Sequence, residues 1–393
     1  MRSLFVTITI VISLVRSSVY ASTDFEAELN GILNKASADV LQQLEVKEQA
    51  LNKRGLKASC NIRNIAIRRE FGDLSKKERK AYTDAVQCLT NKPARTPTSL
   101  FPGVRSRFDD FVATHLNSTL FIHFSGTFLS WHRSFTWEYE QALRNECGYN
   151  GYQPYWDWSK WAAAPQDSPL FDGSAYSLGG NGAPIPHDGL VLPPPLGSGP
   201  PTVLPPGLGG GCVQKGPFAN LTVNLGPLGL FTGAPGPDGG RGYNPRCLKR
   251  DIGPYPSLTY CNYKRIFNLM TQRKTILDFQ NDLEGDGTGD LAPHGGGHFT
   301  IGGDPGGDFF TSPGDPSFYL HHAQVDRMWT LWQAQDPATR QYALHGTNTF
   351  LNLPPSANTT LDDIVDLGYS AQPTYKIRDL MNTVKGPFCY IYL

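Results

Sequence analysis

At 393 residues the chain is long enough for one large domain or two ordinary ones. Its 35 basic and 35 acidic residues leave a formal net charge of zero, which argues against nucleic acid or an anionic membrane surface as a partner. Aromatic residues make up 11% of the chain, and many of them gather in two short segments, 128–143 and 315–333.

The first 21 residues have the pattern of a secretory signal peptide. Arg2 is basic, residues 4–15 form an apolar run too short to span a bilayer, and the segment ends in Val19-Tyr20-Ala21. We therefore expect cleavage after Ala21 and a secreted protein with no membrane association after that cleavage. An uncleaved membrane anchor is the alternative.

Sequons and cysteines fit the secretory route. In that compartment we expect up to three disulfides and one leftover thiol among seven widely spaced cysteines, in a pairing that the sequence does not determine. Asn-x-Ser/Thr triplets also arise by chance, but three of them predict glycosylation at Asn117, Asn220 and Asn358.

Two helical segments follow the predicted signal peptide. Residues 22–58 form an N-terminal extension in which leucines and isoleucines recur at helical intervals between 24 and 53. The dibasic Lys53-Arg54 ends this pattern, either as a solvated helix end or as a protease processing site. Ser75 and Glu78 have the spacing of a capping box, which predicts a helix beginning just after Ser75.

The remaining residues, 59–393, are interpreted as one main domain interrupted by a long insertion. The insertion, 178–260, is rich in Pro and Gly and poor in periodicity, which predicts an irregular excursion. It contains Cys212, Cys247 and Cys261, so disulfides are expected to fasten it. It also separates two groups of histidines.

The first histidine group, His115, His123 and His132, has spacings of eight and nine residues. The second group lies further along the chain and consists of His294, His298 and the pair His321-His322, with its first and last members 28 positions apart. Imidazole suits zinc, copper, iron and nickel, and triads without Cys or carboxylate favour copper or zinc. Although a lone buried histidine is usually a core residue, two such triads predict a two-metal site between the helices of a bundle.

Local patterns place these histidines on helices. Residues 128–143 have helical character, with Ser130 as a possible N-cap, and Asp315 and Pro316 predict the start of another helix. On that second helix Asp326 lies one turn after His322, where its carboxylate is predicted to orient the imidazole. His321 points about 100° away on the helix, so His322 is the preferred ligand.

The stretch "PHGGGH" at 293–298 admits two interpretations. A phosphate-binding loop calls for a lysine and a preceding apolar strand, whereas the residues before it are acidic. With Pro293 in the first helical turn, His294 and His298 lie on one helix face. Each glycine costs about 1 kcal/mol in a helix, a cost that metal binding can offset. The metal-binding interpretation is therefore preferred.

These segments resemble the copper-binding motifs of the tyrosinase, catechol oxidase and molluscan haemocyanin family. The motifs are "FLSWHRSFTWEYEQAL" and "DPSFYLHHAQVDRMW", with "YQPYWDW" and the terminal "YIY" also typical of the family. The greatest likeness is to short secreted fungal tyrosinase-like catechol oxidases. The resemblance implies a mainly α fold with little sheet, in which a four-helix bundle holds two copper ions.

Carried over by position, the resemblance assigns His115, His123 and His132 to copper A. It assigns His294, His298 and His322 to copper B. It further implies that the protein uses O2 to oxidise small phenolic substrates, with o-diphenols converted to o-quinones.

The chain also departs from the family pattern. Phe121 stands where many members have a cysteine cross-linked to a histidine, so no thioether is expected. Gly295 follows the first copper B histidine, where efficient monophenol hydroxylases often have Asn to hold a water. Weak monophenol hydroxylation is therefore expected, with Phe299 adding an apolar wall. The alternatives, in decreasing order of preference, are a true tyrosinase, an oxygen carrier and a zinc hydrolase. The hydrolase is disfavoured because two-metal sites of that kind usually include carboxylate ligands.

Overall fold

The computed structural model describes residues 2–54, 59–194, 196–197, 199–228 and 234–393, and it describes the side chains of residues 2–23 and 52 in no detail. Met1 and the side chains of the predicted signal peptide, 1–21, thus lie outside the described part. Within the described ranges, no helix has both the length and the apolar character needed to cross a membrane.

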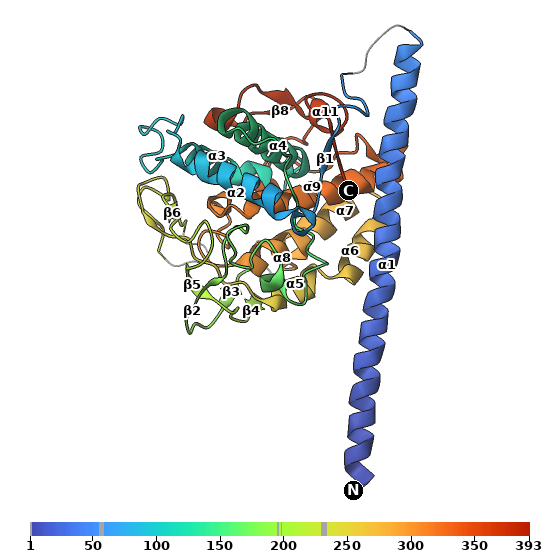
Figure 1. Ribbon diagram of the computed structural model, residues 1–393. Helices are drawn as coiled ribbons and strands as arrows, with labels where there is room; N and C mark the ends of the chain where they lie inside the picture. The colour runs from blue at the N-terminus through green and yellow to red at the C-terminus, as the bar shows by residue number, and fades with distance from the viewer. Residues whose placement is uncertain (1, 55–58, 195, 198, 229–233) are drawn as a thin grey trace.

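The body is mainly helical, which confirms the predicted fold class (Figure 1). The helices are α1 (Arg2–Asn52), α2 (Lys76–Asn91), α3 (Arg107–Ile122), α4 (Phe128–Cys147), α5 (Pro254–Tyr260), α6 (Tyr263–Gln272), α7 (Ile276–Glu284), α8 (Ala292–Ile301), α9 (Phe318–Gln335), α10 (Pro337–Arg340) and α11 (Ile377–Leu380). In the core, α4 packs against α3 and α9, and α8 packs against α9.

The strands are short and pair in twos. They are β1 (Ala66–Arg68), β2 (Gly182–Pro184), β3 (Leu190–Leu192), β4 (Thr202–Leu204), β5 (Gly210–Val213), β6 (Thr222–Val223), β7 (Arg246–Cys247), β8 (Ile364–Val365), β9 (Tyr375–Lys376) and β10 (Tyr390–Tyr392). The pairs β2–β5, β3–β4, β6–β7 and β8–β9 are antiparallel. The pair β1–β10 is parallel and joins the two ends of the domain, with Ala66 opposite Tyr390.

The insertion 178–260 is more regular than the predicted irregular excursion, because six of these strands lie within it. In Figure 1, β3 and β4 lie beside α5, with β2 and β5 next to them. The Cys212–Cys247 disulfide links two parts of the insertion to each other rather than to the helical body. Cys60–Cys389 and Cys88–Cys147 are the other disulfides, and buried Cys261 is the leftover thiol, so the predicted cysteine count is confirmed.

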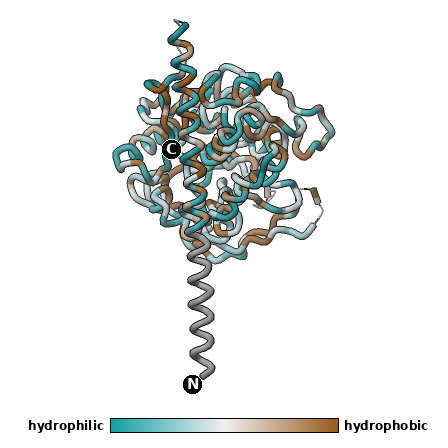
Figure 2. Tube along the Cα trace, turned by 90° about the vertical axis from the view of Figure 1, so that its right-hand side faces the viewer, coloured by the Kyte–Doolittle hydropathy of each residue, from teal (hydrophilic) through white to brown (hydrophobic). Residues whose placement is uncertain are grey.

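Helix α1 lies along one side of the body. Leu29, Leu33 and Ala36 are buried in the core, and the Ser37 hydroxyl donates a 2.9 Å hydrogen bond to the Tyr392 carbonyl. In Figure 2, hydrophobic and hydrophilic residues alternate along the part of α1 that lies against the body, which is the pattern of a helix with one buried face. The exposed Lys53-Arg54 pair directly follows this helix.

Helix starts were predicted with mixed success. The Ser75–Glu78 capping box is present at the start of α2. The prediction for Ser130 is wrong, because α4 already begins at the fully buried Phe128. The prediction for Asp315 is also wrong, since α9 begins at Phe318. The Asp315 carboxylate instead accepts hydrogen bonds from Arg250 at 2.7 and 2.8 Å, and it organises the turn before the helix.

The three predicted glycosylation sites, Asn117, Asn220 and Asn358, are all exposed. Exposure is what an acceptor asparagine requires, and glycosylation of these residues stays a prediction.

Candidate metal centre

Four elements bring the histidines together in the core. His115 lies within α3, His123 is the residue that ends α3, and His132 lies one turn into α4. The second group comes from α8 and α9. His294 and His298 share one face of α8, as their spacing predicts, and the 321–322 pair lies in the first turn of α9.

The first cluster is held by hydrogen bonds to main-chain carbonyls. The Nδ1 atoms of His115, His123 and His132 lie 2.8, 3.0 and 2.8 Å from the carbonyl oxygens of Phe310, Thr119 and Phe128, respectively. A carbonyl only accepts, so each Nδ1 carries the proton and each Nε2 keeps its lone pair. This is the usual arrangement that orients a metal-binding imidazole.

The Nε2 atoms of this cluster fit a metal ion. Those of His115 and His132 are buried without a hydrogen-bond partner among the described residues. The three histidines each offer a nitrogen within 4.8 Å of the others. Buried polar atoms are nearly always satisfied, so converging lone pairs of this kind indicate a cation between them. The donor set contains only imidazole nitrogens, which suits copper or zinc.

The second cluster is equally compact. The rings of His294 and His298 have centroids 4.8 Å apart, and the Nε2 atoms of His298 and His322 are 3.2 Å apart. The Nε2 atom of His294 is buried and unpartnered among the described groups. The clusters adjoin, because the rings of His132 and His322 stack at 4.4 Å. The fold thus brings together all six histidines predicted as ligands.

His321 also lies in the second cluster, but its hydrogen bonding differs. Its Nδ1 accepts a 3.0 Å hydrogen bond from the indole N–H of Trp158. An indole nitrogen only donates, so Nδ1 holds the lone pair and Nε2 holds the proton. His321 therefore has no lone pair free for a metal, which favours His322 as the ligand from this pair.

Burial keeps all of these imidazoles neutral. Desolvation lowers the pKa of His115 to about 4 and that of His298 to about 3. It also brings the pKa values of His123, His132, His294 and His322 well below the ordinary value. A metal binds only the neutral ring, so near neutral pH the clusters need to lose no proton before they bind an ion.

The prediction that Asp326 supports His322 is wrong. The Asp326 carboxylate accepts hydrogen bonds from Arg133 at 2.5 Å and from the hydroxyls of Tyr390 and Tyr392 at 2.6 Å each. The Nδ1 atom of His322 has no hydrogen-bond partner in the described structure. A buried carboxylate gains more from a guanidinium and two hydroxyls than from a neutral imidazole one turn away.

The three glycines of 295–297 serve two purposes. A Cβ atom on Gly296 would lie 2.5 Å from the Cβ of Tyr260, and one on Gly297 would lie 2.3 Å from the Cε1 of His321. These two glycines therefore permit close packing of α8. Gly295 faces a cavity, where an added Cβ would approach the Leu291 side chain at 3.1 Å.

That cavity has a volume of about 330 Å³ and opens onto His123, His294 and His298. Its walls are mainly apolar and include Phe299, as predicted, together with Phe309, whose ring centroid lies 4.6 Å from that of His123. Ligand pockets are commonly apolar with a few polar groups that orient the ligand. The arrangement therefore gives a small organic molecule access to both clusters.

Glu284 is a cavity residue that sequence reasoning missed. It is buried at the end of α7, and its carboxyl accepts a 2.6 Å hydrogen bond from the Phe124 amide. Burial raises its pKa well above the ordinary value, because desolvation disfavours the charged carboxylate. Its place in an acidic stretch that resembles a solvated loop gave no signal for a cavity residue.

Comparison with known proteins gives a consistent result. Residues 105–335 match the common central domain of tyrosinase. Tyrosinase P of Aspergillus terreus is 41% identical over 332 residues, covering 83% of this chain and 91% of that protein. N-acetyl-6-hydroxytryptophan oxidase ivoB of Emericella nidulans is 38% identical over 350 residues, covering 85% and 93% of the two chains.

A solved structure agrees with these relatives. It is of a polyphenol oxidase variant from Thermothelomyces thermophila, is 52% identical, and superposes with a TM-score of 0.88 over 93% of this chain and 98% of the other. The domain match covers more than half of the chain and contains both histidine clusters. The chain therefore belongs to the tyrosinase family and is an oxidoreductase of the polyphenol oxidase type.

Proposed function

We propose that the protein is a secreted dicopper oxidase that uses O2 to oxidise o-diphenols to o-quinones. The observation that carries this proposal is the pair of adjoining imidazole clusters whose free nitrogens converge beside an apolar cavity. Two diphenols give up four electrons and four protons in all, and one O2 takes them up to form two waters.

The donor sets divide naturally between two ions. His115, His123 and His132 would hold copper A, and His294, His298 and His322 would hold copper B. Bound copper supplies the redox chemistry that joins diphenol oxidation to O2 reduction. The protein fixes the rings through main-chain hydrogen bonds and surrounds them with apolar side chains, which exclude water from the reacting ring.

The residues that line the cavity support the expectation that monophenol hydroxylation is weak. Removing a phenol proton needs an acceptor at the mouth of the clusters, and Gly295 has no side chain to position a water there. Glu284 reaches the same cavity, but burial raises its pKa and so disfavours the ionised form, and its carboxyl already accepts a hydrogen bond from the Phe124 amide. A protonated carboxyl is a poor base.

The second candidate is a true tyrosinase that hydroxylates monophenols efficiently. The presence of the Glu284 carboxyl in the cavity favours it, since this group would become a base if substrate binding lowered its pKa.

Oxygen uptake separates the two candidates. The copper-loaded protein is given 4-methylcatechol or, in a parallel run, p-cresol without any diphenol primer. We expect immediate uptake with the catechol and a far slower rate with the monophenol. Equal initial rates would favour the true tyrosinase, and no uptake with either substrate at full copper loading would refute the oxidase.

The assignment of His322 is tested by copper content. His322→Ala should bind about one copper per chain, because one of the three imidazoles of copper B is lost. His321→Ala is the matched control from the neighbouring position, and it should keep close to two. The reverse result, measured by metal analysis after dialysis, would make His321 the ligand.

A further inference from the structure

The hairpin β3–β4 of the insertion forms one wall of the cavity. Leu192, Pro193, Pro194 and Thr202 line it. Leu192 is only 4% exposed, whereas Val191 and Val203 on the opposite side of the hairpin are 64% and 58% exposed. The hairpin therefore presents one face to the cavity and the other to solvent.

Hydrogen bonds fasten this wall to the loop before α8. The Thr202 hydroxyl donates to the Gly289 carbonyl at 2.5 Å, and the Leu196 amide donates to the Gly287 carbonyl at 3.3 Å. Gly287 and Gly289 line the cavity as well. The wall is thus continuous from the hairpin to α8, and the cavity extends beyond the space needed by a single phenol ring.

The charged groups of the cavity are all acidic. Among the described residues that line it, none is Lys or Arg. Asp290 pairs with Arg265 at 2.7 Å, and this guanidinium also contacts Asp282 at 3.0 Å. Buried Asp308 accepts the amides of Phe310 and Thr311 and the Thr311 hydroxyl. The described lining of the cavity therefore offers no unpaired cationic side chain to an anionic ligand.

Positive charge from bound copper does not change this conclusion for the outer part of the cavity. A phenol that presents its hydroxyls to the clusters directs a para substituent away from them, toward the hairpin wall. The cavity lining available to the substituent includes Leu192, Pro193 and Phe350, and its charged side chains are acidic, as Asp290 is. A carboxylate at that position would lose hydration and gain no partner, which is costly.

We propose, resting on the diphenol oxidation above, that the cavity selects neutral phenols with an extended apolar para substituent. Phenols whose substituent ends in a carboxylate are rejected. The hairpin β3–β4 supplies one wall of this apolar lining, so the insertion takes part in selecting the phenols that reach the histidine clusters.

Steady-state rates test the proposal with three catechols on the copper-loaded protein. They are 4-butylcatechol, 4-methylcatechol and 3-(3,4-dihydroxyphenyl)propionate. We expect kcat/KM for the butyl compound to exceed that for the methyl compound about tenfold, because three more methylenes are buried. The propionate should fall at least about tenfold below the butyl compound and also below the methyl compound, because the loss of apolar contact alone would leave it near the methyl value. Comparable values for the propionate and butyl compounds would overturn the proposal.

A pair of neighbouring variants in α3 tests whether the charge of the cavity lining sets the selectivity. Leu120 lines the cavity and is 48% exposed, so a lysine is accommodated there; Phe121 is 55% exposed and is not a lining residue. Leu120→Lys should raise kcat/KM for the propionate relative to 4-methylcatechol about twofold to fivefold, as an exposed ion pair allows. Phe121→Lys should leave the ratio unchanged. An equal change in both variants would show that overall charge, not the cavity, sets the ratio.

Equilibrium binding measures the selectivity of the cavity without requiring that the protein oxidise the ligand. Isothermal titration compares 4-butylresorcinol with 3-(2,4-dihydroxyphenyl)propionate, two meta-diphenols that cannot form an o-quinone directly. Tighter binding of the butyl compound supports the cavity's selectivity even if no catechol is oxidised, in which case the proposed function alone fails. Equal or tighter binding of the propionate refutes the selectivity even if catechols are oxidised.

Discussion

Gly295, Gly296 and Gly297 occupy successive positions on one helix, yet each of them lies against different neighbouring residues. Gly296 and Gly297 are required because Tyr260 and His321 lie where a Cβ would stand. Gly295 has only the Leu291 side chain close by, at a distance that a small shift relieves. A side chain is therefore tolerated at 295 alone, where it enters the cavity.

Replacing Gly295 with asparagine should raise the monophenol rate relative to the diphenol rate by at least about threefold. The amide would hold a water beside His294, and even an imperfect proton acceptor provides a rate gain of this size. The ratio of initial oxygen uptake with p-cresol and 4-methylcatechol measures the effect.

Gly295→Ala serves as the control, since it adds the same Cβ without an amide. An unchanged ratio in Gly295→Asn, with normal copper content, would remove the role assigned to this position. The same rise in both variants would assign the effect to packing against Leu291.

At the scale of elements, a buried charge network ties α4 and α9 to the paired strands β1 and β10. Arg68 of β1 contacts Glu140 at 2.9 Å, and its guanidinium stacks on the ring of Tyr390 at 3.7 Å. Arg133 and the two tyrosines meet the carboxylate of Asp326. These partners occupy the Asp326 carboxylate one turn beyond His322, and none of them is a histidine, so we expect the network to act on stability.

Asp326→Asn should destabilise the fold by about 3 kcal/mol, because it leaves Arg133 buried with an uncharged partner. Asp84→Asn is the control: its ion pair with Lys80 is exposed, and its loss should cost less than about 0.5 kcal/mol. Denaturant unfolding gives both values.

Copper content distinguishes this structural role from support of a metal ligand. Below its unfolding transition, Asp326→Asn should bind as much copper as the parent protein. Copper loss without a change in stability would instead mean that Asp326 acts on His322.

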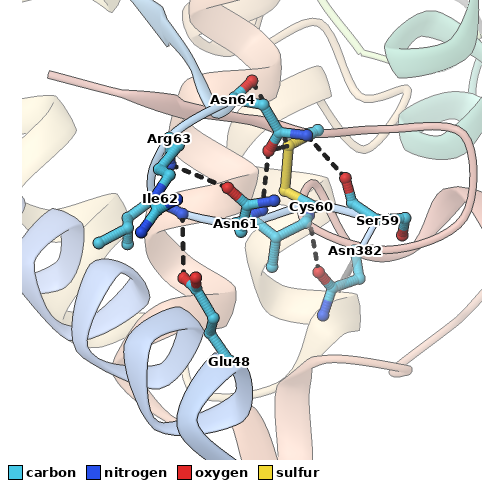
Figure 3. Close-up of a disulfide and its surroundings, with 10 residues drawn as sticks. Glu48, Ser59, Cys60, Asn61, Ile62, Arg63, Asn64 and Asn382 are labelled. Atoms are coloured by element: carbon cyan, nitrogen blue, oxygen red, sulfur yellow. Dashed lines mark hydrogen bonds between the residues drawn. A yellow bond between two sulfur atoms is a disulfide. The ribbon is translucent and has the colours of Figure 1, made fainter. Parts of the chain in front are cut away.

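Over the whole molecule, the Cys60–Cys389 disulfide closes a loop with a sequence separation of 329 residues. Figure 3 shows it between the segment after α1 and the last part of the chain, where the Asn64 side chain bonds to the Asn61 amide and the Ser59 carbonyl. Together with the pairing of β1 and β10, it holds the two ends of the domain side by side.

The double variant Cys60→Ser/Cys389→Ser should lose about 2 to 5 kcal/mol of stability, because a long loop is released in the unfolded chain. Cys212→Ser/Cys247→Ser should lose less, since its separation is only 35 residues. Thermal unfolding ranks the two, and the opposite order would show that local strain or packing outweighs loop length.

The sequence predicted the parts of the site that depend on spacing along one helix. His294 and His298 share a face because they are four residues apart, and Ser75 caps α2 through a residue three positions on. Asp326 has the same spacing from His322, yet Arg133 and two tyrosines from distant segments compete for its carboxylate. Helical spacing fixes which residues are close, but it does not fix which partner binds most strongly.

The cavity wall was beyond sequence reasoning for a related reason. Residues 190–204 contain two three-residue strands within a Pro-rich segment, too short for a visible alternation. Leu192 faces the cavity because the hairpin is bound to the loop at 287–289, about 90 residues further along the chain. Such contacts follow from tertiary packing alone.

The pairing of β1 with β10 also constrains the order of events during synthesis. The partner of Ala66 is Tyr390, so the growing chain carries β1 unpaired until residue 390 has emerged. His115, His123 and His132 lie within 18 residues, and the last two find their carbonyl partners four residues away. The partner of His115 is Phe310, and His294 and His322 must wait for α8 and α9. Contacts of such long range form late and slow the folding of a chain. The first histidine cluster is thus complete in sequence long before the scaffold around it can close, so we expect its metal-binding geometry to form only at the end of folding.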